Sequence, residues 1–71
     1  MDLKMKITIN GNEYFKFETG INVHDLIQKL NLSDKQIIVE LNQIALMQKD
    51  YKTSLLNDGD IIEIVQIAAG G

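Results

Sequence analysis

One short amphipathic helix set among strand-like segments constrains the fold of this chain most strongly. Asn22 can cap a helix, and the apolar residues that follow it recur at helical spacing, at Val23, Leu26, Ile27 and Leu30. A helix of this length is only marginally stable alone in water, so its apolar stripe must pack against a sheet. The pattern therefore predicts a two-layer α+β domain.

The segments before this helix have the pattern of a β-hairpin. Apolar and polar residues alternate over residues 3–10, and Asn10-Gly11-Asn12 then offers residues that tolerate the positive φ of a tight turn. In the segment after the turn, the same alternation places Phe15 and Phe17 on the core face of the sheet and Tyr14 on the opposite face. We therefore expect two antiparallel strands here.

Three further strand-like segments follow the helix. Residues 36–41 and 44–47 flank a turn at Asn42-Gln43, and a tight turn at residues 57–60 precedes residues 61–67. The last segment is apolar on both faces, which predicts a central strand with one face on the helix and part of the other exposed. This order is that of the β-grasp or ubiquitin-like fold, a mixed sheet of four to five strands with one packed helix and with its first and last strands parallel at the centre.

The composition excludes several classes of function. With 71 residues the chain allows one small domain, spanning 1–71, and without cysteine it has neither a disulfide framework nor a thiolate nucleophile. A net charge of −3 opposes binding to nucleic acid, and no apolar run is long enough to span a membrane. We therefore expect a cytoplasmic protein with no nucleic-acid or membrane partner.

A catalytic or metal site is not expected in the chain itself. A small sheet with one short helix has little volume for a pocket, so we predict a protein that is not an enzyme, with no catalytic residues and no metal ligands. His24 beside Asp25 could be an oriented general base, but it also fits a solvated residue in the first turn of the helix. Asp58 and Asp60 flank Gly59 in the pattern of a turn and lack the spacing of a calcium loop.

The last four residues carry the candidate site. Ala68, Ala69, Gly70 and Gly71 have no bulky side chains and follow the last strand directly, so we expect them to form a flexible tail. Glycines lack Cβ and permit close approach of another backbone, so such a tail can enter a narrow channel of a partner. The carboxylate of Gly71 is then the group that the tail delivers to the active site of the partner.

A partner that receives this tail needs a surface on which to dock. We predict that it contacts the exposed face of the last strand, at Glu63, Val65 and Ile67, with Leu46 and Met47 nearby. The acidic balance of the chain suggests that the partner presents a complementary basic surface.

Five sequence blocks give the chain a resemblance to the ThiS/MoaD family of ubiquitin-like sulfur carriers. They are residues 7–11 (ITING), 23–27 (VHDLI), 39–42 (VELN), 56–65 (LNDGDIIEIV) and 69–71 (AGG). The resemblance implies that a ThiF-like activating enzyme, using ATP and Mg²⁺, adenylates Gly71. Sulfur from a cysteine desulfurase pathway then converts the terminus to a thiocarboxylate, which a ThiG-like thiazole synthase consumes in thiamine biosynthesis. The carrier itself would bind no cofactor.

Three alternatives share the same terminus. The small subunit of molybdopterin synthase has the same fold and chemistry, but its members usually carry a proline-containing tail, and this chain has no proline. A ubiquitin-like modifier would be conjugated through Gly71 to a lysine of a target protein. A plain interaction module would not use its terminal glycines at all. The overall pattern favours the thiamine branch of the sulfur carriers.

Overall fold

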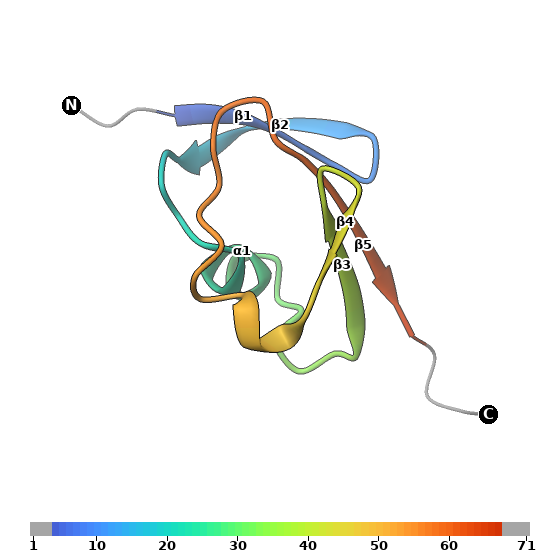
Figure 1. Cartoon of the computed structure of the whole chain (residues 1–71). Helices are drawn as coiled ribbons and strands as arrows, with labels where there is room; N and C mark the ends of the chain where they lie inside the picture. The colour runs from blue at the N-terminus through green and yellow to red at the C-terminus, as the bar shows by residue number, and fades with distance from the viewer. Residues whose placement is uncertain (1–3, 68–71) are drawn as a thin grey trace.

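The predicted order of strands and helix is found in the structure, a computed structural model that describes residues 4–67 (Figure 1). The elements are β1 (Lys4–Ile9), β2 (Asn12–Glu18), α1 (Val23–Lys29), β3 (Ile37–Leu41), β4 (Ile44–Leu46), the 3₁₀ helix η1 (Gln48–Asp50) and β5 (Ile61–Gln66). No helix within residues 4–67 is long and apolar enough to cross a membrane. The predicted tail at residues 68–71 lies outside the described residues.

The five strands form one mixed sheet in the order β2-β1-β5-β3-β4. β1 and β5 run parallel, with Thr8 opposite Ile61 and Ile9 opposite Ile62, whereas the other neighbouring strands are antiparallel. Helix α1 covers one face of the sheet (Figure 1). The α+β β-grasp prediction is therefore confirmed, including the parallel pair of first and last strands at the centre.

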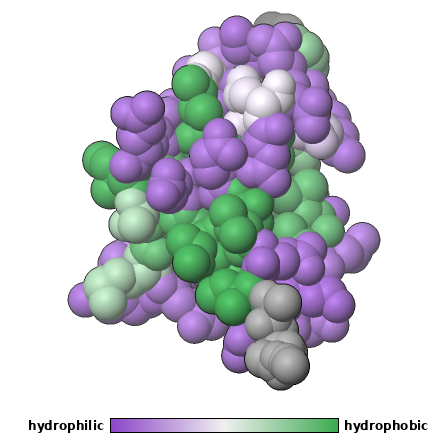
Figure 2. All heavy atoms as spheres, turned by 90° about the vertical axis from the view of Figure 1, so that its right-hand side faces the viewer, coloured by the Kyte–Doolittle hydropathy of each residue, from purple (hydrophilic) through white to green (hydrophobic). Residues whose placement is uncertain are grey.

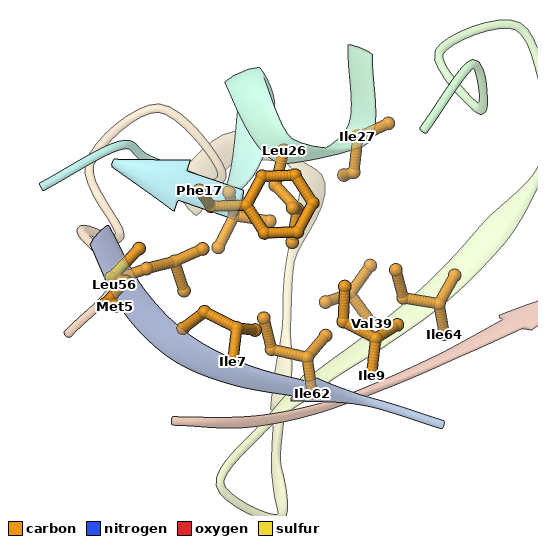
Figure 3. Close-up of a cluster of buried hydrophobic side chains, with 11 residues drawn as sticks. Met5, Ile7, Ile9, Phe17, Leu26, Ile27, Val39, Leu56, Ile62 and Ile64 are labelled. Atoms are coloured by element: carbon orange, nitrogen blue, oxygen red, sulfur yellow. The ribbon is translucent and has the colours of Figure 1, made fainter. Parts of the chain in front are cut away.

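The core lies between α1 and the inner face of the sheet, as Figure 3 shows. Asn22 caps the helix as predicted, because its side-chain Oδ1 accepts the N–H of Asp25 at 2.7 Å. Asn31, with a φ of 61°, follows the helix in the left-handed conformation that commonly ends helices. The buried apolar residues are Met5, Ile7, Ile9, Phe17, Val23, Leu26, Ile27, Val39, Leu56, Ile62 and Ile64.

The prediction that Phe15 packs in the core is wrong. Phe17 is 3% exposed, as predicted, but Phe15 is 62% exposed and Tyr14 is half-buried against the core. The cause is a β-bulge: Met5 pairs with Phe17 and Ile7 with Tyr14, so two residues of β2 face one residue of β1. The extra residue shifts the alternation of β2, and it brings the rings of Tyr14 and Phe17 to the same side, with centroids 6.1 Å apart.

Candidate functional site

The strand that leads to the predicted tail begins at a loop held by side-chain hydrogen bonds. Asp58 Oδ1 accepts the N–H of Lys6 at 2.7 Å, and Asp60 Oδ2 accepts the N–H of Asn57 at 2.8 Å. Asn42, in the β3–β4 turn, donates from Nδ2 to Asp60 Oδ1 at 3.0 Å and accepts the N–H of Ile61 at 2.9 Å. The two aspartates therefore anchor the start of β5 through turn hydrogen bonds, as the sequence pattern indicated.

Asn10 holds the second half of β5. The N–H groups of Thr8 and Asn10 donate to the carbonyls of Asp60 and Ile62, at 3.0 and 2.9 Å, and there the parallel ladder of β1 ends. The Asn10 side chain continues it, because Nδ2 donates to the carbonyl of Ile64 at 3.0 Å and Oδ1 accepts the N–H of Ile64 at 2.7 Å. A side-chain amide thus replaces one peptide group of a neighbouring strand.

The far end of β5 is fixed by β3. The N–H of Ile67 donates to the carbonyl of Gln36 at 2.8 Å, which extends the antiparallel ladder to the last described residue. The position from which residues 68–71 continue is therefore set by backbone hydrogen bonds rather than by a loop.

The face of the sheet opposite α1, called the outer face here, carries large exposed apolar side chains (Figure 2). Ile38 lies directly opposite Val65, and alternation with the buried Ile62 and Ile64 turns the side chains of Ile61 and Ile67 to the same face. The exposed fractions are 48% for Ile38, 58% for Val65, 49% for Ile61 and 48% for Ile67. An apolar surface of this kind is typical of a protein–protein contact.

Four of the five residues predicted for the partner surface have positions compatible with the outer face. Val65, Ile67 and Glu63 alternate with the buried residues of β5, and Met47, which is 64% exposed, follows β4 in an extended conformation. Leu46 does not belong to this surface: it pairs with the fully buried Val39, so its side chain lies on the inner face, half-buried against the core.

Sequence reasoning missed three residues of the outer face. Ile38 and Ile61 extend its apolar area, and Glu40 lies directly opposite Glu63. The alternation of β3 around Val39 could have indicated Ile38 and Glu40, but their neighbours depend on a strand register that the sequence does not reveal.

The chain also has a groove of about 470 Å³ between α1 and the β3–β4 hairpin. His24 lies half-buried in its wall, close to Tyr51, whose carbonyl accepts the backbone N–H of His24 at 3.1 Å. Burial raises the pKa of the Tyr51 phenol above its ordinary value of 10.0. Within residues 4–67 no carboxylate pairs with the His24 imidazole, so no contact of the described residues supports an oriented general base.

The mixed five-stranded sheet under one helix, with its central last strand held at both ends, defines a β-grasp domain of the ubiquitin-like class. Comparison with known families is more specific. The chain belongs to the ThiS family, whose model matches residues 5–71 and so includes the two final glycines.

Individual relatives extend this result. The sulfur carrier protein ThiS of Bacillus subtilis is 35% identical over 66 residues, which cover 92% of this chain and 98% of that protein. A thiazole synthase of Paramagnetospirillum magneticum is 34% identical over 67 residues, which cover 94% of this chain but only 20% of that protein. The crystal structure of the thiamine biosynthesis protein ThiS from Geobacter metallireducens superposes with a TM-score of 0.80 at 28% identity, covering 94% of this chain and all of the other.

Proposed function

We propose that this chain is a sulfur carrier of thiamine biosynthesis and that the carboxyl group of Gly71 carries the sulfur. The observation that carries this conclusion is the match to the ThiS family over residues 5–71, on a fold whose central strand leads to Ala68, Ala69, Gly70 and Gly71. The carrier is not itself an enzyme. It acts in the cytoplasm as a protein substrate of partner enzymes.

The chemistry requires activation because a carboxylate is a poor acyl donor. A ThiF-like activating enzyme, with ATP and Mg²⁺, converts the Gly71 carboxylate to an acyl adenylate and releases pyrophosphate. The persulfide sulfur of a cysteine desulfurase pathway then attacks the acyl carbon and displaces AMP, which gives an acyl disulfide. A thiol, such as the excess cysteine, reduces its S–S bond, which leaves a thiocarboxylate at Gly71 and oxidises the thiol and the donor to a disulfide. Thiazole synthase accepts this sulfur. The chain has no cysteine, so no thiol of its own competes for the activated terminus.

The absence of bulky side chains after Ile67 supports this role. Residues 68–71 are two alanines and two glycines, which permit an extended backbone to enter a narrow active site. The outer face, beside the strand that ends at Ile67, supplies the apolar area on which a partner docks.

Mass spectrometry of the C-terminal fragment tests the proposal. The chain is incubated with the activating enzyme, ATP, Mg²⁺ and a cysteine desulfurase with cysteine, and we expect exchange of one oxygen for sulfur at Gly71. Methionine oxidation has nearly the same nominal mass, so accurate mass and a fragment without Met1, Met5 and Met47 are required.

Two variants make the test specific. Deletion of Gly70-Gly71, or extension by one residue beyond Gly71, must abolish thiocarboxylate formation while the fold is unchanged. An unmodified Gly71 under these conditions would contradict the proposal, and a bond between Gly71 and a lysine of another protein would indicate a modifier instead.

A further inference from the structure

Two carboxylates face each other in the middle of the outer face. Glu40 of β3 and Glu63 of β5 are directly opposite in the antiparallel ladder, a position that separates Cβ atoms by about 5 Å. Like charges in this arrangement destabilise a sheet. Within residues 4–67, the lysines of β1 form ion pairs with acids of β2, Lys4 with Glu18 at 3.6 Å and Lys6 with Glu13 at 3.7 Å, and Lys16 of β2 lies over the rings of Tyr14 and Phe17. Neither Glu40 nor Glu63 has an ion-pair partner in that part of the chain.

Apolar side chains surround this pair along both strands. On β5, Ile61 precedes Glu63 and Val65 follows it on the same face, and Val65 is opposite Ile38 of β3. A protein that covers the apolar residues must also remove water from the carboxylates. Removing water from two carboxylates that have no cation beside them would cost more free energy than burial of the apolar side chains contributes.

The surroundings of the Glu40–Glu63 pair determine which cation of a partner would fit it best. An arginine guanidinium is planar, presents several donors and can bond to two carboxylates at once, while its aliphatic stem packs on apolar neighbours such as Val65 and Ile61. A lysine ammonium is a more strongly hydrated point charge and fits a desolvated pair less well.

We propose that the outer face docks an apolar surface of thiazole synthase and that an arginine of that enzyme lies between Glu40 and Glu63. This inference rests on the proposed function. Thiazole synthase is the partner because, in the relative from Paramagnetospirillum magneticum, a segment similar to this chain is part of a much longer thiazole synthase, so the two kinds of domain occur in one protein. Docking here also places the partner beside the strand that continues into Gly71.

The test measures binding and folding stability together. The affinity of the full-length chain for the thiazole synthase of the same organism is determined by isothermal titration calorimetry, for wild type, Glu40→Gln, Glu63→Gln and Glu63→Lys. We expect each glutamine variant to lose about tenfold in affinity and Glu63→Lys to lose more. All three variants are expected to unfold at the wild-type temperature or above it, because each removes the repulsion and Glu63→Lys replaces it with an attractive pair.

Glu18→Gln is the matched control, since it removes the same charge from edge strand β2, and it should bind thiazole synthase like wild type. If the pair had only a structural role, each substitution in it would change the stability and the affinity in the same direction. Wild-type affinity for both Glu40→Gln and Glu63→Lys would overturn the proposal, as would equal losses in the Glu18→Gln control.

The Gly71 thiocarboxylate, measured in the same samples, separates this inference from the proposed function. Normal thiocarboxylate formation with unchanged binding of the variants refutes only the docking site. A wild-type chain that neither carries sulfur nor binds thiazole synthase refutes both.

Discussion

Asn10 offers the sharpest test of how the fold holds the strand that leads to the tail. Asn10→Ala removes two hydrogen bonds to Ile64, of 2.7 and 3.0 Å, each of which contributes about 1 kcal/mol to the free energy of unfolding. Alanine at the Asn10 φ of 50° costs about 1 kcal/mol more. The expected loss is about 3 kcal/mol, a large part of the roughly 4–11 kcal/mol expected for a chain of this length.

Urea denaturation followed by circular dichroism measures this loss, and Asn31→Ala is the control. Asn31 has a φ of 61° but makes no side-chain hydrogen bond within residues 4–67, so its replacement should cost only about 1 kcal/mol. Asn10→Gly removes the bonds without the backbone strain and should lie between the two. If Asn10→Ala were no more destabilising than Asn31→Ala, the side-chain bridge to Ile64 would contribute nothing and the reasoning would fail.

Three further substitutions test other features. Phe17→Ala should cost about 3–4 kcal/mol by urea denaturation and Phe15→Ala less than about 1 kcal/mol, and equal costs would contradict the bulge. Gln43→Gly should raise stability in the same assay by about 0.5–1 kcal/mol, because Gln43 has a φ of 71° in a tight turn; a loss would contradict the turn geometry. Burial raises the pKa of the Tyr51 phenol above 10.0 in the folded state. The stability that depends on the neutral phenol is therefore complete below pH 10 and is lost as the pH rises through the pKa of Tyr51 in the folded state. The unfolding temperature of Tyr51→Phe should therefore fall less above pH 10 than that of wild type. Equal falls in the two proteins would refute this.

Most of the architecture could be predicted because it depends on local periodicity. The stripe in α1 and the cap at Asn22 are local features, and the apolar character of residues 61–67 on both faces indicates a central strand. Once the order of elements is known, the handedness of the crossover leaves little choice for the parallel pair β1–β5. The structure confirms each of these features.

Features that depend on register could not be predicted in the same way. The bulge that exposes Phe15 has no local marker, because it arises from the count of residues between two pairings of β1 and β2. The inner position of Leu46 follows from the pairing of Leu41 with Ile44, which the two-residue turn imposes. The Asn10–Ile64 bridge joins residues 54 positions apart, and no pattern along the chain connects them.

The register of the strands also explains how β5, which carries part of the outer face and precedes the tail, is held in place. The backbone ladder of β1 with β5 reaches only Ile62, so beyond it the side chain of Asn10 replaces the neighbouring strand on one side, while β3 pairs with β5 as far as Gln66. Glu63 and Val65 flank the clamped Ile64 and point to the outer face. A partner that binds these two side chains therefore contacts a strand whose backbone is fixed on both sides. The same strand ends just before the residues that lead to Gly71 in the sequence, so docking on the outer face brings the partner beside the strand that precedes the terminus proposed to carry sulfur.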